Sequence, residues 1–294
     1  MNASSKRNLF LVIVFLLVAF SLKEVSGLPS GGSYPPTFTR RADGDWYDSW
    51  GFDRNDYSGV NGYMPNIAYE TLGINKESAY SLGEWFKTSY ASKTQRAVAI
   101  LKYVQRWTEY GYDVDNVVIG GTVQPEWAWN ADEMAHMFNT TTNAVAVGDC
   151  EDMAFLCATI YIGAGFDAAM VLAPRHAALL IWLPEYSNAN YYWDIPNDGR
   201  GRGWIWVEAT GEHNPLGWTP PDFKDGNWAA YPLGLMIFNV NYTPQNPQAE
   251  DNVTITASVV NATASISQVS LNYSIQGGVY NTLAMTPKDA VYEA

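Results

Sequence analysis

The chain has 294 residues, of which 47% are hydrophobic, and a formal net charge of −13. This apolar content is enough to build a buried core, which excludes a chain that is disordered throughout. Acidic side chains outnumber basic ones by 30 to 17, and no Lys/Arg-rich stripe is present to displace counterions from phosphates. We therefore expect no nucleic-acid partner.

The first 27 residues have the pattern of a secretory signal. Lys6 and Arg7 precede an apolar run from Leu9 to Phe20, and small residues follow at 25–27. A helix over that run would rise about 18 Å, well short of the roughly 30 Å hydrocarbon core of a bilayer. We expect a cleaved signal; the alternative is an uncleaved anchor that tethers the protein to a membrane. Both place the protein outside the cell, either secreted or at the cell surface.

Glycosylation sequons agree with export. Asn-X-Ser/Thr triplets begin at Asn139, Asn241, Asn252, Asn261 and Asn272. The sequence therefore predicts an exported glycoprotein.

The next segments predict a spacer and then a domain of mixed helix and strand. Residues 28–40 are rich in Gly, Pro and Ser, which is typical of a flexible spacer. Within residues 41–235, apolar periodicity predicts helices first: one that begins after Ser92, one over residues 131–138 and one over residues 150–164. Strands are predicted over residues 168–173, 177–183 and 204–209. Helices followed by an antiparallel sheet indicate the α+β class.

A second domain is predicted over residues 236–294. Charge nearly disappears there, and hydrophobic and polar residues alternate in runs that turn residues separate, as in a β-sandwich. The segment is shorter than the roughly 100 residues of an immunoglobulin-like domain. We therefore expect a partial β-sandwich, either a truncated module or one that continues beyond this chain.

The two cysteines of the chain are Cys150 and Cys157. On one helix their Cα atoms would lie about 10.5 Å apart, beyond the roughly 7 Å limit for a disulfide. We therefore expect two unpaired thiols. Cys157 lies among apolar residues and is interpreted as a core residue.

Cys150 is the candidate nucleophile. It follows Asp149, a predicted helix N-cap whose capping box is completed by Asp152. The positive end of the helix favours a thiolate there, while Glu151 and Asp152 oppose it, so a cationic partner is required. His176, at the start of a predicted strand, is the candidate base, and Glu208, in an aromatic strand, is the acid that would orient it.

These residues carry a resemblance to a known family. The segments at 148–154, at His176-Ala177 and at 206–210 resemble the transglutaminase-like superfamily, in the form that its microbial members have. The resemblance implies a papain/transglutaminase-like core, with helices packed on an antiparallel sheet, and a triad of Cys150, His176 and Glu208. This chain departs from the common pattern by having Glu rather than Asp at 208. The family also implies an oxyanion donor upstream, for which Gln124, Trp127 and Trp129 are the candidates.

Three functions remain open on the sequence. The leading hypothesis is an exported thiol-dependent acyl-transfer enzyme that acts on protein or peptide amides without a cofactor, as a cysteine protease, an amidohydrolase or a transglutaminase. The second is a catalytically silent binding module of the same fold for peptide or glycan chains. The third is a zinc site, since Cys, His and Glu can all ligate zinc, although no short ligand spacing is present.

Overall fold

A computed structural model describes residues 19–20, 36–49, 51–58, 62–67, 78–195, 200–233, 235–245, 247–248, 251–261, 266–273, 281–288 and 291–294. Most of the predicted signal segment and spacer lies outside these residues. The chain divides into two compact units, residues 31–234 and residues 1–30 with 235–294. Within the described residues, none of the helices combines the length and the hydrophobicity that crossing a bilayer requires.

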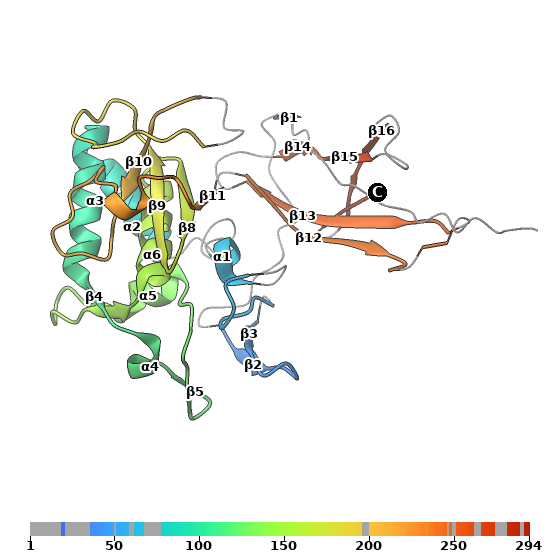
Figure 1. The fold of residues 1–294 in the computed structure, drawn as a ribbon, viewed down its shortest axis with the longest axis horizontal. Helices are drawn as coiled ribbons and strands as arrows, with labels where there is room; N and C mark the ends of the chain where they lie inside the picture. Colours follow the sequence, from blue (N-terminus) through green and yellow to red (C-terminus); the bar gives the residue numbers. More distant parts are fainter. Residues whose placement is uncertain are drawn as a thin grey trace, which may run out of the picture. The chain divides into compact units, whose positions relative to one another are not determined.

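The larger unit contains the helices (Figure 1). Its four longer helices are α2 (Ser78–Ser89), α3 (Lys93–Trp107), α5 (Ala131–Met137) and α6 (Cys150–Gly163), and single turns form α1 (Tyr63–Asn66) and α4 (Asp113–Asn116). Ser92 caps α3 by accepting a hydrogen bond from the Gln95 N–H, as its sequence predicts. The helix ends at Trp107, because the chain turns there into a strand.

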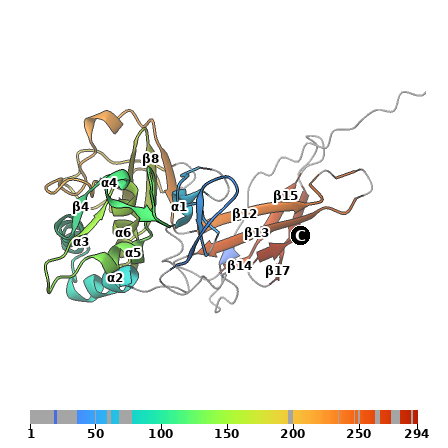
Figure 2. The same cartoon turned by 90° about the horizontal axis from the view of Figure 1, so that it is seen from below.

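Helix α6 lies at the centre of this unit. Every residue after Cys150 in this helix is buried, as expected for a helix that is apolar all round. Helices α2 and α5 pack against it on one side of the sheet (Figure 2). The backbones of α2 and α6 approach so closely that a Cβ added to Gly83 would lie 2.2 Å from the Ile160 carbonyl oxygen. Glycine is therefore required at this crossing.

A four-stranded antiparallel sheet covers the other side of α6. Its strands run in the order β10 (Trp204–Val207), β9 (His176–Trp182), β8 (Ala168–Ala173) and β11 (Ala229–Pro232). The sheet face away from α6 carries an aromatic cluster, in which Trp193, Trp204 and Trp206 are buried and Phe223 and Trp228 pack against them. The 3-10 turn η3 (Pro221–Phe223) supplies Phe223. The α+β class predicted from the sequence is thus confirmed.

Short strands complete the larger unit. Strand β4 (Thr108–Tyr110) pairs in parallel with β7 (Ala146–Gly148), while β2 (Phe38–Arg40) pairs with β3 (Trp46–Asp48) and β5 (Val118–Ile119) with β6 (Thr122–Val123). The β4–β7 register places Tyr110 opposite Gly148, two residues before Cys150.

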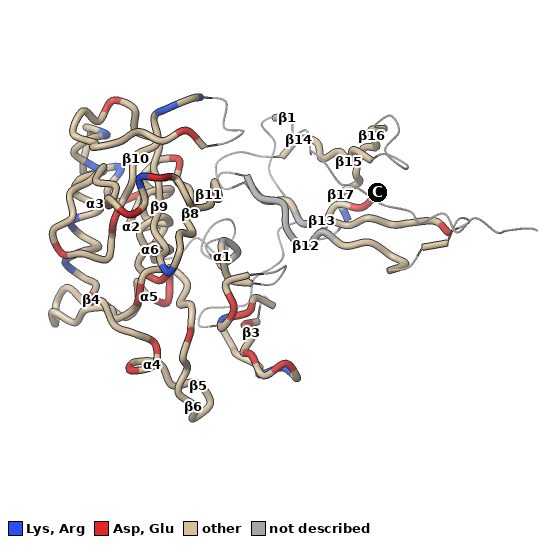
Figure 3. The backbone as a smooth tube through the Cα atoms, viewed as in Figure 1, with Lys and Arg blue, Asp and Glu red and all other residues tan. Residues whose placement is uncertain are grey.

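A buried ion network joins the N-terminal segment of this unit to α5. The Arg54 side chain is fully buried, and its guanidinium lies 2.9 Å from Asp48 and 2.8 Å from Glu133. Glu133 also accepts a hydrogen bond from the Asn130 N–H, which completes the capping box of α5. Acidic positions also mark α4 and α5 in the charge pattern of the backbone (Figure 3).

The smaller unit consists of antiparallel strand pairs over its described residues. One sheet has the order β12 (Leu235–Thr243), β13 (Thr254–Asn261), β18 (Val291–Glu293) and β17 (Thr286–Lys288). The pairs β15 (Ser270–Tyr273) with β16 (Asn281–Ala284) and β1 (Ala19–Phe20) with β14 (Ile266–Gln268) are separate. Ile255, Val259, Val269 and Leu271 are among its buried core residues. Its assignment as a partial immunoglobulin-like module stays a prediction.

Candidate active site

Cys150 begins helix α6, and buried acids organise the turn around it. The Asp149 N–H donates to Asp152 at 3.1 Å, and the Trp129 N–H donates to the same carboxyl group at 2.7 Å. Burial raises the pKa of Asp152 well above its ordinary value, although these two backbone donors oppose the rise. Asp152 therefore acts as a structural acid that fixes the start of α6.

His176 and Glu208 meet because of the pleat of the sheet. Strands β9 and β10 pair with Leu180 opposite Trp206, and this register, continued to the strand end, places Glu208 opposite Ala178. His176 is two residues from Ala178, so it lies on the same face as Glu208 and diagonal to it, within reach of a long side chain. The His176 Nε2 and Glu208 Oε2 atoms are 2.9 Å apart.

The Glu208 carboxylate is held by several further donors. The Trp206 indole N–H donates to Oε2 at 3.2 Å, and the Thr210 hydroxyl donates to Oε1 at 2.6 Å. Burial raises the pKa of Glu208, but the hydrogen bonds and charge of His176, with those of Thr210 and Trp206, outweigh it and leave the pKa below the ordinary value. Only 3% of Glu208 is exposed, so the site holds a buried carboxylate in its ionised form.

The His176 ring is positioned on three sides. It stacks on Phe223 at a centroid distance of 5.2 Å with the rings 3° from parallel. Burial lowers its pKa, but the neighbouring Cys150 and Glu208 raise it from 6.5 to about 10. Since Nε2 faces Glu208, Nδ1 is the nitrogen left for the thiol. Cys150, His176 and Glu208 are thus brought together, which gives the cationic partner that the thiol lacked on its own helix.

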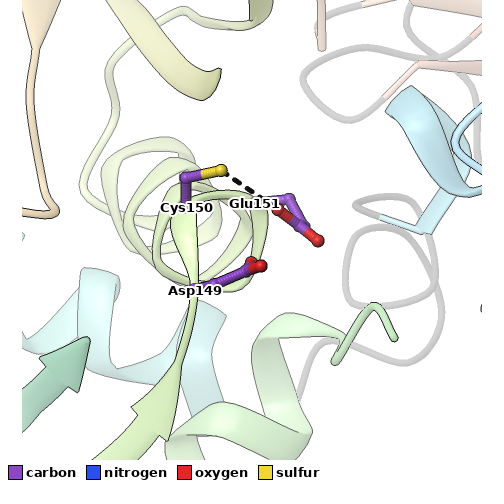
Figure 4. Close-up of side chains that lie close together, drawn as sticks. All are labelled: Asp149, Cys150 and Glu151. Carbon is purple, nitrogen blue, oxygen red and sulfur yellow. Dashed lines mark hydrogen bonds between the residues drawn. The ribbon is translucent and has the colours of Figure 1, made fainter. Parts of the chain in front are cut away.

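The thiol has a second partner, Glu151. The Cys150 Sγ donates to Glu151 Oε2 at 3.2 Å, and the carboxyl group of Asp149 lies nearby (Figure 4). Glu151 is 4% exposed, and burial together with the neighbouring Asp149 raises its pKa well above the ordinary value. Burial also raises the pKa of Asp149, so both acids disfavour the ionised form beside the thiol.

Further acids extend this buried cluster. The Tyr63 hydroxyl donates to Glu126 and, at 3.4 Å, to Glu151. Burial raises the pKa of Asp113 to about 7, and the Asp149 charge adds to the rise. Two groups of possible metal ligands are present, and within each group the ligand atoms lie within 4.8 Å of one another. One group is Asp113, Glu126 and Glu151, and the other is Asp149, Cys150 and Glu151. Within the described residues, neither group combines Cys150 with His176 and Glu208, the three ligands of the zinc hypothesis.

Two surface hollows flank this constellation. The larger, of about 760 Å³, is lined by both Cys150 and His176, and the smaller, of about 550 Å³, by His176 and Glu208. Among the residues that line the larger hollow, those that the sequence did not single out include Tyr57, Tyr63, Tyr110, Tyr112 and Arg175. The large aromatic content was the one sequence signal for them, and it does not distinguish a cleft from a core.

The predicted oxyanion donors lie elsewhere. Gln124 is buried and donates to the Thr122 carbonyl, and Trp127 is fully buried with its indole N–H unpaired. Trp129 packs edge-on against Trp127 at a centroid distance of 5.6 Å. None of the three is among the described residues that line the hollow beside Cys150.

The other histidines and the second cysteine are apart from the site. His136 lies on α5 and contacts the Ser78 hydroxyl at 3.0 Å, and His213 is an exposed loop residue. Both cysteines are free, as predicted. Cys157 is fully buried, and burial raises the pKa of its thiol.

Comparisons with known proteins give little further information. No family model matches the chain, and no curated protein matches it. Among solved structures, the chain is similar to a candidate cysteine protease from Cytophaga hutchinsonii, with 11% sequence identity, a TM-score of 0.30, and coverage of 100% of this chain and 89% of that one. A similarity this low carries no argument about this chain, so the function must be argued from its own site.

Proposed function

We propose that this protein is a thiol-dependent acyl-transfer enzyme that acts on protein or peptide amides through Cys150, His176 and Glu208. The observation that carries the proposal is the 2.9 Å hydrogen bond between His176 and the buried Glu208, with His176 and Cys150 lining the same hollow. A nucleophile, a base and an acid that orients the base are the groups that covalent amide chemistry requires.

The first half of the reaction forms a thioester. In the reactive form the Cys150 proton is on His176, whose pKa of about 10 favours the imidazolium, and the thiolate sulfur attacks the amide carbon, whose oxygen takes up the negative charge. The Cys150 backbone N–H at the start of α6 stabilises this oxyanion. The His176 imidazolium then protonates the departing amine as the carbon–nitrogen bond breaks. Glu208 remains ionised throughout and stabilises the imidazolium.

The second half depends on the acceptor. His176 removes a proton from water, whose oxygen attacks the thioester and releases a carboxylic acid and the Cys150 thiol. A lysine amine in place of water would give a crosslinked amide. We propose hydrolysis, because water needs no second binding site. Export to the cell surface is part of the same proposal and rests on the N-terminal sequence pattern.

The hydrogen bond between Cys150 and Glu151 describes a resting state. In the reactive form this hydrogen bond is broken, because the Cys150 proton is then on His176. A substrate that occupies the hollow beside Glu151 would favour the reactive form.

Alkylation tests the nucleophile directly. The rate at which iodoacetamide modifies Cys150 at neutral pH, followed by mass spectrometry, should exceed that of a model thiol and fall at least tenfold in His176→Gln. Cys150→Ala is the control for the site of labelling. Incubation with a peptide mixture should release new termini that Cys150→Ala does not release. Labelling no faster than the model thiol, with no turnover of any peptide, would refute the proposal.

One observation supports the binding module as a second candidate. The hollow carries exposed aromatic side chains, among them Tyr57 at 50% and Tyr112 at 64%, which could stack on a peptide or glycan chain. Binding of both the wild type and Cys150→Ala to a peptide or glycan array, without turnover, would favour this function over catalysis.

A further inference from the structure

Arg175 has a backbone conformation that its side chain does not favour. Strands β8 and β9 pair Ala173 with His176, so Pro174 and Arg175 form a two-residue turn. Arg175 has a φ of +58°, in the left-handed region. Gly or Asn usually occupies such a position, and a bulky residue there costs on the order of 1 kcal/mol or more. A strained residue next to a functional histidine calls for a reason other than folding.

Arg175 is also a cation without a partner. The described residues give it no ion pair and no side-chain hydrogen bond, whereas Arg54, Arg96 and Arg200 each donate to carboxylates or carbonyl groups. Its side chain is exposed, so ordering it against a ligand would displace only water.

Its location makes this cation relevant to the site. Arg175 lines both the hollow that holds Cys150 and the hollow that holds Glu208, and among the described residues that line them it is the one Lys or Arg. The other charged residues of the larger hollow are Glu126, Asp149, Glu151 and the imidazole of His176. In a chain of net charge −13, a substrate with a carboxylate would be repelled from this cleft unless a cation received it.

We propose that Arg175 forms a carboxylate-binding subsite beside the nucleophile, so that the enzyme prefers peptides with a carboxylate near the amide that Cys150 attacks. The proposal rests on the proposed function and specifies its substrate class. A planar guanidinium can bind a carboxylate through two parallel hydrogen bonds, which fixes both position and orientation. The carboxylate can belong to an acidic side chain or to a free C-terminus, which share this chemistry.

The first experiment needs no turnover. Iodoacetate and iodoacetamide differ by a carboxylate in place of an amide, and each reacts when the Cys150 sulfur forms a bond to carbon and iodide leaves. We would measure the ratio of the two alkylation rates at Cys150 in the wild type and in Arg175→Asn. Asn tolerates a positive φ, so the turn is preserved and the melting temperature should not fall.

The expected result is a ratio about three to ten times lower in Arg175→Asn, from the loss of one charge a few ångströms from the reacting carboxylate. Added salt should lower the wild-type ratio more than that of the variant. The matched control is Arg202→Asn, which changes the net charge equally at an exposed residue that lines neither hollow. An unchanged ratio in Arg175→Asn, or an equal fall in Arg202→Asn, would overturn the proposal.

The second experiment identifies the source of the carboxylate. A peptide that the wild type cleaves is prepared with Glu or Gln next to the cleaved bond, and with a free or amidated C-terminus. If kcat/KM is higher for the Glu peptide than for the Gln peptide and the difference is lost in Arg175→Asn, the carboxylate belongs to an acidic side chain. If the same pattern holds for the free over the amidated C-terminus, the carboxylate is that of the C-terminus. If the enzyme shows no preference in either pair of peptides, the proposal is contradicted. If no peptide is cleaved, the acyl-transfer function fails, while the alkylation ratio still decides on the subsite.

Discussion

The interaction of Glu208 with His176 makes a quantitative prediction. Glu208→Gln replaces the carboxylate by a neutral amide of nearly the same shape, whose oxygen can still accept from the Trp206 indole while its NH2 group donates to the Thr210 hydroxyl oxygen. The rise in the His176 pKa from 6.5 to about 10 corresponds to about 5 kcal/mol, which Cys150 and Glu208 supply against the cost of burial. A close carboxylate supplies about 1.4–4 kcal/mol of such a rise, so in Glu208→Gln the His176 pKa should fall toward 6.5.

Proton NMR of the imidazole Cε1–H measures this pKa, and the three histidines are assigned with His176→Gln. His136 and His213 serve as internal controls because neither is near Glu208. Glu208→Asp is the matched variant: it retains the charge but shortens the arm by one methylene, so its His176 pKa should lie between those of the wild type and Glu208→Gln. An unchanged His176 pKa in Glu208→Gln would refute the electrostatic account of the site.

The same pair predicts how stability depends on pH. The folded pKa of His176 lies above its unfolded value, so its contribution is fully present below pH 6.5 and is lost as the pH rises through about 10. The folded pKa of Glu208 lies below its unfolded value of 4.5, so its contribution is present above pH 4.5 and is lost at lower pH. The stability lost in Glu208→Gln, from urea denaturation, should therefore be greatest between pH 4.5 and 6.5 and should nearly vanish above pH 10. A loss that is equal at all pH values would contradict this account.

Other substitutions test the frame around the site. Gly83→Ala should destabilise by several kcal/mol, because its Cβ would lie 2.2 Å from the Ile160 carbonyl oxygen; a change below about 1 kcal/mol in urea denaturation would refute the crossing. Arg54→Met removes the cation that two buried carboxylates share and should cost about 3–5 kcal/mol, which restoring the original net charge of the cluster with Asp48→Asn should partly recover. Asp113→Asn should stabilise the protein above pH 7 and have little effect near pH 4, because the folded state disfavours the ionised carboxylate; equal effects at both pH values would count against the raised pKa. Cys157→Ala should lower stability by about 1 kcal/mol and leave alkylation of Cys150 unchanged, whereas slower alkylation would show that the two thiols are coupled.

Sequence patterns predicted the elements that carry the triad because local signals define them. The predicted strand over residues 168–173 matches β8, and the predicted helix from Cys150 matches α6 to within a residue. Helix α2 was missed, since its hydrophobic face is interrupted by Gly83, whose role appears only when α6 packs against it. The apolar periodicity after Ser92 also gave no sign that the helix stops at Trp107, where pairing with β7 takes over.

The sequence named the candidate site residues but not their surroundings. Order along the chain selected Cys150, His176 and Glu208, and the pleat of β9 and β10 provides the reason that the last two meet. Burial could not be inferred from the sequence, and it raises the pKa of Glu151 and packs Trp127 in the core instead of along the cleft. The Arg175 conformation depends on a turn that Pro174 alone does not specify.

The arrangement of α6 and β9 has a consequence for how this protein tolerates change. The sulfur and the imidazole belong to different elements, and the apolar packing between α6, which is buried beyond Cys150, and the sheet helps to set their separation. A helix that slides along its axis by one residue moves its first residue by about 1.5 Å, enough to break a hydrogen bond. Substitutions deep in this packing, remote from any substrate, should therefore lower the reactivity of Cys150 before they measurably lower the stability of the fold.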